Sequence, residues 1–256
     1  MEPAARDGVL IVGGIAAGVA IAVTVIKLAS KKTDAVPITK SVPVGAVVEK
    51  SFPPWTEGRT AEMVMGDDIK AAVYRGKNDM KIRDLVIGIV KNNGLDGRQK
   101  IQVAAACQKW MRENITYIFD PWRTEVFQEA RVTLFEKMAG DCDDQAIALA
   151  AMLMSVGIPA EIILLSQEPD FNPKTGRFRH VFAAAIVDGG KEVWLETIMP
   201  GGDYPDYRHY HTGLMRIDMS TPTLPAVKVI EAIPNGAGVK TPLFFASGLD
   251  TADDYR

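Results

Sequence analysis

The sequence predicts an α+β fold in which helices pack on an antiparallel sheet, preceded by an N-terminal hydrophobic helix. The first half of the central region has apolar residues at helical spacings, whereas the second half has three short apolar runs that are typical of strands. The chain has 256 residues, of which 47% are hydrophobic and 24% charged, so it is long enough to bury a core without disulfides or structural metals.

The composition also limits the partners of the protein. Lys and Arg number 29 against 32 Asp and Glu, which gives a net charge of −3. Such a chain has no basic field to hold a phosphate backbone, so we expect no nucleic-acid partner. The two cysteines, Cys107 and Cys142, lie in sequence that favours helices, and we interpret them as free thiols.

Residues 1–32 form the first predicted segment, because Gly8 to Ile26 run for 19 residues without a charge. As a helix this run would be about 28 Å long, close to the hydrocarbon thickness of a bilayer. Its acidic start and the lysines after it do not match a cleaved signal peptide. We expect residues 8–26 to bind a membrane or a hydrophobic partner; the alternative is a buried helix of an oligomeric assembly. If a translocon inserts the helix, the lysines place the remaining chain in the cytoplasm.

Residues 33–60 contain four prolines among valines and are predicted to be an extended tether. The next segment, residues 61–200, begins with helical sequence over 61–93, and a second helix is predicted over 98–114. Cys107 lies in the middle of that second helix. Nothing near it favours a thiolate, so we interpret it as a small buried hydrophobic residue.

The most informative segment is Gly140-Asp141-Cys142-Asp143-Asp144, which precedes a helix predicted over 145–156. That helix is apolar on all sides, so protein must nearly surround it, and Gly157 and Pro159 end it. Cys142 then lies at the positive end of a buried helix. Backbone N–H groups at such an end favour a thiolate and can hold an oxyanion.

The three aspartates around Cys142 raise the alternative of a cation site. Acids at a helix start are explained by capping and by the helix dipole, and the spaced oxygen ligands of a calcium loop are absent from the sequence. His209 and His211 form an H-x-H pair without an evident third ligand. We therefore predict no metal and no cofactor.

Three strands are predicted after this helix, over 160–166, 180–187 and 192–198, with a tight hairpin at Asp188-Gly189-Gly190. His180 begins the second strand and Glu196 lies near the end of the third, so antiparallel pairing brings them side by side. Together with Cys142 they supply a nucleophile, a base and an orienting acid for thiol acyl transfer. Residues 201–256 are predicted to add strands and a tail packed on this core.

Five phrases in this order resemble the transglutaminase-like core of the papain-like superfamily. They are Trp110-Met111-Arg112-Glu113-Asn114-Ile115-Thr116-Tyr117, Gly140 to Asp144, Gly157-Ile158-Pro159-Ala160, His180-Val181-Phe182 and Trp194-Leu195-Glu196-Thr197. The resemblance implies a papain-like fold, with Cys142 as the nucleophile, His180 as the base and Glu196 as the acid that orients the imidazole. Glu196 departs from the pattern, because the family usually has Asp at this position.

The resemblance implies a thiol acyl-transfer enzyme, either a cysteine peptidase or amidase or a protein cross-linker, that acts through an acyl-Cys142 intermediate. Its substrate would be a peptide or protein, with the peptidoglycan stem peptide as one option. The Asp-Cys-Asp-Asp sequence, with Thr133-Leu134 before it, looks most like transglutaminase-like proteins of tailed phages, so we expect membrane or virion association. The alternative is a non-catalytic structural or ejection component of a phage virion that keeps the fold for binding.

Overall fold

The computed structural model describes residues 65–120, 126–168, 171–172, 177–198 and 212–223 with their side chains. It also describes the backbone of residues 36–37, 47–50, 55–56, 59–64, 125, 224, 227–232 and 244–245. The hydrophobic stretch at 8–26 and the C-terminal tail at 250–256 lie outside the described residues. Among the helices that are described, none is long and apolar enough to cross a membrane.

A six-stranded sheet forms the centre of the fold, with its strands in the order β13-β11-β8-β9-β10-β14. The strands are β8 (Ala160–Ser166), β9 (His180–Val187), β10 (Lys191–Leu195), β11 (Gly213–Ile217), β13 (Val227–Ala232) and β14 (Phe244–Phe245). Neighbouring strands are antiparallel, except that β10 and β14 are parallel. The predicted α+β fold with an antiparallel sheet is therefore confirmed.

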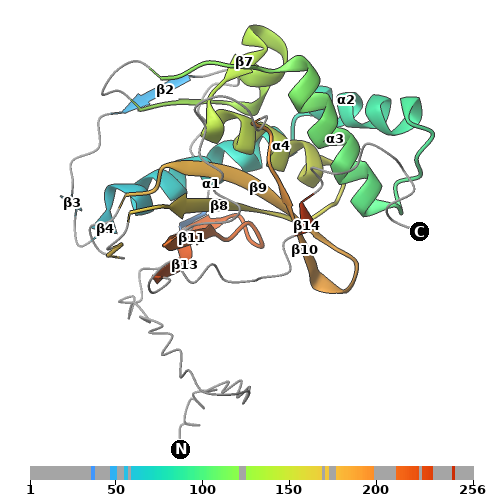
Figure 1. Ribbon diagram of the computed structural model, residues 1–256. Helices are drawn as coiled ribbons and strands as arrows, with labels where there is room; N and C mark the ends of the chain where they lie inside the picture. The colour runs from blue at the N-terminus through green and yellow to red at the C-terminus, as the bar shows by residue number, and fades with distance from the viewer. Residues whose placement is uncertain are drawn as a thin grey trace, which may run out of the picture.

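Four α-helices accompany the sheet in the described part of the chain, and α1, α3 and α4 lie along one side of it (Figure 1). They are α1 (Ala61–Lys77), α2 (Met80–Asn92), α3 (Lys100–Asn114) and α4 (Cys142–Ser155). Alternate residues of β9 pack with these helices in the main core, among them Val181 and Ala183. Phe182 and Ala184 belong instead to a second cluster with Trp194. Because side chains alternate along a strand, this second cluster lies on the face of the sheet away from α4.

The helical stretch predicted over 61–93 consists of two helices, because a new helix begins after Asp79. The Asp79 side chain caps α2 by accepting the Lys81 backbone N–H at 2.8 Å. Helix α1 packs very closely on α4: a Cβ atom on Gly76 would lie only 2.7 Å from the Ala151 Cβ. Glycine at this position therefore permits the close approach of the two helices.

The turns around the sheet agree with the predicted positions. Gly157 has φ of +82°, and next to it the Ile158 N–H reaches the Leu153 carbonyl at 3.0 Å, which ends α4 and starts the path into β8. The hairpin between β9 and β10 is the 3₁₀ turn η2 (Asp188–Gly190), with Gly189 and Gly190 at φ of 75° and 77°. The predicted third strand is shorter than expected, since β10 ends at Leu195 and Glu196 follows it.

Short strand pairs flank the main sheet. They join β1 (Val36–Pro37) to β12 (Thr223–Leu224), β2 (Val47–Lys50) to β6 (Glu125–Gln128), β3 (Trp55–Thr56) to β4 (Arg59–Thr60) and β5 (Thr116–Tyr117) to β7 (Ala139–Gly140). A π-helical turn, η1 (Val132–Lys137), leads into β7. The stretch predicted as a tether thus contributes two backbone pairings with later parts of the chain, through β1 and β2.

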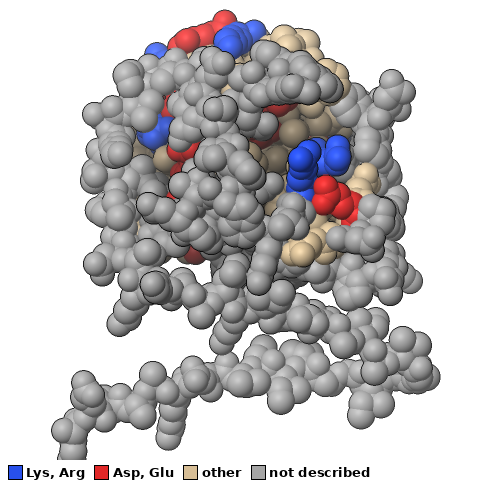
Figure 2. Space-filling model, turned by 90° about the vertical axis from the view of Figure 1, so that its left-hand side faces the viewer, with Lys and Arg blue, Asp and Glu red and all other residues tan. Residues whose placement is uncertain are grey.

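Charged side chains of both signs are mixed on the face shown in Figure 2, where the coloured Lys and Arg atoms lie beside those of Asp and Glu. Independently of that view, the Arg216 Nη1 lies 3.2 Å from the Glu161 carboxylate and 2.7 Å from that of Glu192. These three residues come from β11, β8 and β10, so the ion pairs connect strands across the main sheet.

Candidate active site

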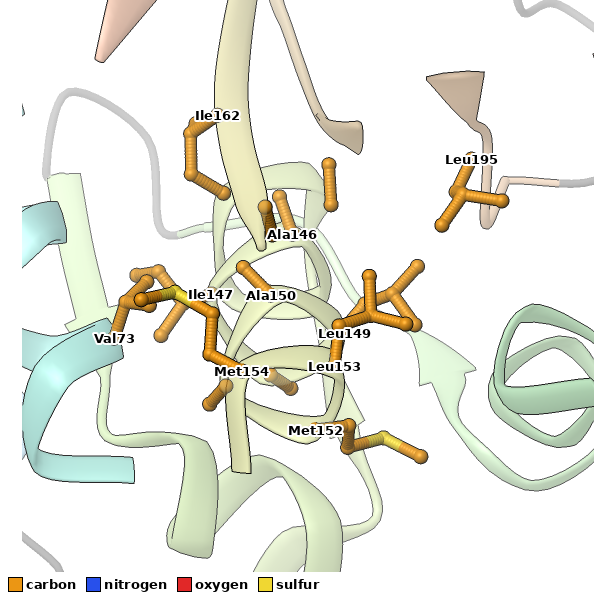
Figure 3. Close-up of a cluster of buried hydrophobic side chains, with 14 of the residues drawn as sticks. Val73, Ala146, Ile147, Leu149, Ala150, Met152, Leu153, Met154, Ile162 and Leu195 are labelled. Carbon is orange, nitrogen blue, oxygen red and sulfur yellow. The ribbon is translucent and has the colours of Figure 1, made fainter. Parts of the chain in front are cut away.

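Cys142 is the first residue of α4, the helix that forms the centre of the core. Every residue of α4 from Asp143 to Met154 is buried, and Figure 3 shows the helix between Val73 of α1, Ile162 of β8 and Leu195 of β10. The helix start is held in place by the Gln145 N–H, which bonds to the Asp141 carbonyl at 3.1 Å. Cys142 itself is half-buried. The expectation of a cysteine at the start of a surrounded helix is therefore confirmed.

The capping of α4 differs from the expectation for its acidic residues. Asp141 occupies the N-cap position, yet its side chain makes no capping hydrogen bond. The Asp143 Oδ1 accepts the Asp144 N–H at 2.8 Å instead. The Asp141 Oδ1 is buried and has no hydrogen-bond partner, so its charge acts on the neighbouring carboxyl groups rather than on the helix end.

His180 and Glu196 lie side by side, as strand pairing predicts. The His180 Nε2 lies 2.5 Å from the Glu196 Oε2, and the two side chains are 5% and 15% exposed. The other carboxylate oxygen, Oε1, accepts the Ile198 N–H at 2.9 Å, which fixes the carboxylate. Contact with Glu196 thus engages the Nε2 of the ring, and Nδ1 is the nitrogen on the opposite side of the imidazole.

The order of the elements places this pair at the end of the sheet where α4 begins. Helix α4 has 14 residues and β8 has 7, so each is about 20 Å long, and the turn at Gly157 reverses the chain between them. The last residues of β8 are therefore level with Cys142. Leu165, near that end, is the register partner of His180. The His180 ring lies 5.8 Å from the Phe182 ring, measured between centroids.

Two residues of α3 position Glu196 through its backbone. The Glu196 carbonyl accepts hydrogen bonds from the Gln108 Nε2 at 2.6 Å and the Arg112 Nε at 2.9 Å. These two roles are not predicted by the sequence. Gln108 interrupts an otherwise apolar stripe, and Arg112 lies in the first of the five phrases. Neither pattern indicates that the hydrogen-bond partner is Glu196, more than 80 residues further along the chain.

A buried carboxyl, Asp144, connects α4 to β6 and, through Gln128, to β7. Its Oδ1 accepts the Gln128 N–H at 2.7 Å and its Oδ2 accepts a bond from the Gln128 side-chain amide. Burial raises the pKa of Asp144 to about 7; the bonds from Gln128 oppose the rise, and the charges of Asp141 and Asp120 add to it. Burial, followed by the charge of Asp141, also raises the pKa of Asp120 to about 6.

The three aspartates at the start of α4 are close enough to raise the question of a metal ion, since one oxygen of each lies within 4.8 Å of the others. Their hydrogen bonds argue against this use. Both oxygens of Asp144 already accept bonds from Gln128, and Asp143 accepts the Asp144 N–H. The H-x-H pair at 209–211 lies outside the described residues. The prediction that the protein holds no metal or cofactor stays a prediction.

Ile118 and Phe119 form an exposed apolar lip that follows β5, the strand paired with the segment leading to Cys142. Tyr117 of β5 is the register partner of Gly140, two residues before Cys142, and the Ile118 N–H reaches the Gly140 carbonyl at 3.3 Å. Ile118 is 55% exposed and Phe119 is 70% exposed. The Phe119 ring contacts the Tyr117 ring edge-on, at 5.1 Å between centroids. The neighbouring Trp122 lies outside the described residues.

The two cysteines differ sharply in their surroundings. Cys107 is fully buried among the side chains of the main core, and burial raises the pKa of its thiol to about 12. It is therefore protonated at neutral pH, as expected for a core thiol. Cys142 is half-buried at a helix start. The interpretation of Cys107 as a small buried hydrophobic residue is confirmed.

Two solved structures are similar to parts of the chain, and this chain spans less than a third of the length of each. One is a candidate cysteine protease from Cytophaga hutchinsonii, with 22% identity, a TM-score of 0.28 and coverage of 37% of this chain and 30% of that one. The other is a candidate protease from Parabacteroides distasonis, with 15% identity, a TM-score of 0.40 and coverage of 62% and 31%. No curated protein matches the sequence.

The family comparison is more specific. Residues 90–210 match the sequence profile of the Transglutaminase-like superfamily, and this range includes Cys142, His180 and Glu196. The match supports a thiol-dependent enzyme of the cysteine hydrolase or transamidase kind. The five phrases of the sequence and the antiparallel sheet behind a buried helix agree with it. Residues 90–210 are therefore similar to the transglutaminase-like superfamily, in agreement with the resemblance that the five phrases indicate.

Proposed function

We propose that the protein is a thiol acyl-transfer enzyme that acts on an amide bond of a peptide or protein through an acyl-Cys142 intermediate. The observation that carries this proposal is the contact of 2.5 Å between the His180 Nε2 and the Glu196 Oε2, at the end of the sheet where α4 begins. A buried histidine held by a fixed carboxylate is the arrangement required of a base that must keep one tautomer and one orientation.

In the proposed reaction, the Cys142 thiol gives its proton to the Nδ1 of His180, and the thiolate attacks the carbonyl carbon of the amide. The backbone N–H groups in the first turn of α4 would stabilise the oxyanion. The imidazolium then protonates the leaving amine, and a thioester remains on Cys142.

The thioester is resolved by a second nucleophile. If water attacks, with His180 as the base, the products are a carboxylic acid and the free thiol. If an amine attacks, the product is a new amide and the enzyme is a transamidase. Both outcomes regenerate the Cys142 thiol and the neutral imidazole, and both use the same three side chains. Glu196 would keep the ring oriented in each half-reaction and would stabilise the imidazolium.

The lip of Ile118 and Phe119 supports a peptide or protein substrate. The two exposed side chains follow β5, which pairs with the segment leading to Cys142, so they adjoin the place where the acyl donor must lie. Large exposed apolar side chains beside a nucleophile favour contact with a substrate side chain. Their position favours an acyl donor that carries an apolar residue close to the reacting amide.

The test is intact-mass spectrometry of the full chain after brief treatment with iodoacetamide. We expect one added carbamidomethyl group, at Cys142, while Cys107 remains unlabelled. Glutamine-containing peptides and peptidoglycan stem peptides are then added as competitors, and a mass increase on Cys142 would identify the acyl donor. If the native protein labels Cys142 as slowly as Cys107, the enzymatic proposal is wrong and a binding role of the fold is favoured.

We also propose, from the uncharged sequence of residues 8–26, that the N-terminal segment binds a membrane or a hydrophobic partner. The full chain should sediment with phosphatidylcholine vesicles, and a variant lacking residues 1–32 should not. The shortened chain should keep Cys107 protected from iodoacetamide, which shows that its core is folded. Equal sedimentation of the two proteins would contradict this proposal without affecting the one about Cys142.

A further inference from the structure

Asp144 is a residue of the first turn of α4 to which the proposed reaction gives no role. It lies two residues after Cys142 and is 1% exposed. Gln128 donates to it twice, from the backbone N–H at 2.7 Å and from the side-chain amide, and the same amide also donates to the Ala139 carbonyl at 3.2 Å. The buried Asp144 carboxyl therefore ties the start of α4 to β6, and the Gln128 amide extends this link to β7.

Gly140 completes this arrangement by leaving room for the carboxyl. A Cβ atom on Gly140 would lie 2.5 Å from the Asp144 Cβ, 2.7 Å from its Oδ2 and 3.0 Å from the Gln128 Nε2. Atoms cannot approach this closely, so any other residue at 140 would displace the Asp144 side chain or the Gln128 amide. The glycine two residues before Cys142 is therefore explained by the space that Asp144 requires.

The charge of Asp144 changes in a pH range where the enzyme would work. Burial raises its pKa to about 7, and the charges of Asp141 and Asp120 contribute to this rise. The ionisable groups around the cluster come from several elements: Asp141, Cys142 and Asp143 at the start of α4, Asp120 after β5, Lys137 of η1, and Glu129 after β6, which is paired with Arg75 of α1. A carboxyl that gains its charge near neutral pH, two residues from a thiol, alters the local potential there.

We propose that Asp144 is a positioning residue for Cys142: its carboxyl holds the first turn of α4 against β6 and, through Gln128, against β7, and its charge, when present, disfavours anionic reactants at the thiol. A role of Asp144 in catalysis rests on the proposed function. The test of the inference does not, because a thiol can be alkylated without enzymatic turnover. Acyl donors without a carboxylate next to the reacting amide are the substrate class that this arrangement favours above pH 7.

The experiment compares two alkylating reagents of similar size on the full chain, neutral iodoacetamide and anionic iodoacetate, from pH 5.5 to 9. For the wild type, the ratio of the iodoacetamide rate to the iodoacetate rate at Cys142 should rise by about threefold to tenfold as Asp144 ionises around pH 7. Asp144→Asn keeps an acceptor for the Gln128 N–H and should abolish this rise. Both rates are proportional to the same fraction of Cys142 thiolate, so this fraction cancels in their ratio. If Asp144 had only a structural role, the ratio would therefore not depend on pH through Asp144.

Asp120→Asn is the matched control, because it removes another acid of the same cluster. Since the Asp120 charge raises the pKa of Asp144, this variant should keep the rise and move it to lower pH. Gly140→Ala keeps all the charges but displaces Asp144, and it should slow both reagents at every pH.

Cys107 reports folding in each variant, since it labels only when the core opens. An Asp144→Asn profile that rises as in the wild type, with Cys107 protected, would overturn the inference. If Asp144→Asn exposes Cys107, a second variant, Gln128→Met, provides the test. This variant removes the side-chain bond that lowers the pKa of Asp144, so the rise in the rate ratio should move to higher pH. A rise at the same pH as in the wild type would also overturn the inference. A wild-type Cys142 no faster than Cys107 would count against the proposed function, whereas unchanged ratios count against this inference alone.

Discussion

Arg112 and Glu196 are joined by a hydrogen bond of 2.9 Å from the Arg112 Nε to the Glu196 backbone carbonyl. Gln108, one turn earlier on α3, donates to the same carbonyl at 2.6 Å. The helix therefore fixes the position of Glu196 through the backbone and leaves its carboxylate for His180 and the Ile198 N–H. The histidine is thus oriented by a residue that is itself anchored from the opposite side.

Gln108→Leu should weaken catalysis by loosening this anchor. The change keeps the size of the side chain but removes a donor to a part-buried carbonyl, which costs about 1 kcal/mol. We expect kcat for a peptide that acylates Cys142 to fall about fivefold, with KM nearly unchanged, because Gln108 acts through Glu196. Lys109→Leu, at an exposed site one residue further along α3, is the control. Equal kcat values for the two variants would show that Gln108 does not position Glu196.

Glu196→Gln tests whether the carboxylate orients His180. An amide cannot stabilise the imidazolium, and if its NH₂ group faces the Nε2 of the ring it favours the wrong tautomer. We expect kcat/KM to fall by about two to four orders of magnitude while the melting temperature changes little. Glu196→Asp keeps the charge and loses one methylene of reach, so its effect should be mild. A Gln variant with wild-type activity would make Glu196 a bystander and leave Cys142 and His180 to act as a dyad.

Stability should fall as the pH rises from about 4 to about 7, through Asp144. In the native state burial raises the pKa of this carboxyl to about 7, whereas in the unfolded chain it titrates near 4. The native protein therefore holds this proton more tightly, and the stabilisation present at low pH is lost as pH passes through the native pKa. Relative to Asp144→Asn, the wild type should lose about 2 kcal/mol or more of unfolding free energy between pH 4.5 and pH 8.

Urea denaturation of both proteins at pH 4.5, 6 and 8 measures this difference. The comparison with the variant isolates Asp144 from other acids, such as Asp120 and Glu129, whose pKa values burial also raises. Asp96 is shifted the other way, because Arg98 lowers its pKa to about 2, and its contribution changes only below this pH window. Parallel curves for wild type and variant would mean that Asp144 titrates alike in the folded and unfolded chain.

The features that the sequence predicted well are those with local signals. One is the apolar run of α4, which Gly157 ends; the other is the pair of hairpin glycines between β9 and β10. In both, the element is determined by residues that are neighbours in the sequence. The break at Asp79 was missed because a cap depends on two or three residues within a long helical pattern. Partners such as Gln128 and Asp144 were also missed, because their pairing depends on how β6 packs against α4 and has no periodic signature.

The apolar lip of Ile118 and Phe119 leads to a prediction about substrate preference. Ile118, Phe119 and Met80 are the large hydrophobic residues that are exposed in the described part of the chain, and the first two follow β5, which pairs with the segment leading to Cys142. If Phe119 contacts a substrate side chain, Phe119→Ser should raise KM about threefold to thirtyfold for donors with a large apolar residue, and it should leave kcat nearly unchanged.

Donors with alanine at that place should lose much less, because there is little apolar surface for Phe119 to cover. Met80→Ser is the matched control, since Met80 is 62% exposed and belongs to α2 rather than to the segment that pairs with Gly140. The measurement is steady-state kinetics on paired peptides that differ only at the apolar residue. The same KM change for both peptides, or for both variants, would mean that Ile118 and Phe119 do not contact the apolar side chain of the substrate. The substrate contacts would then have to come from other residues around Cys142.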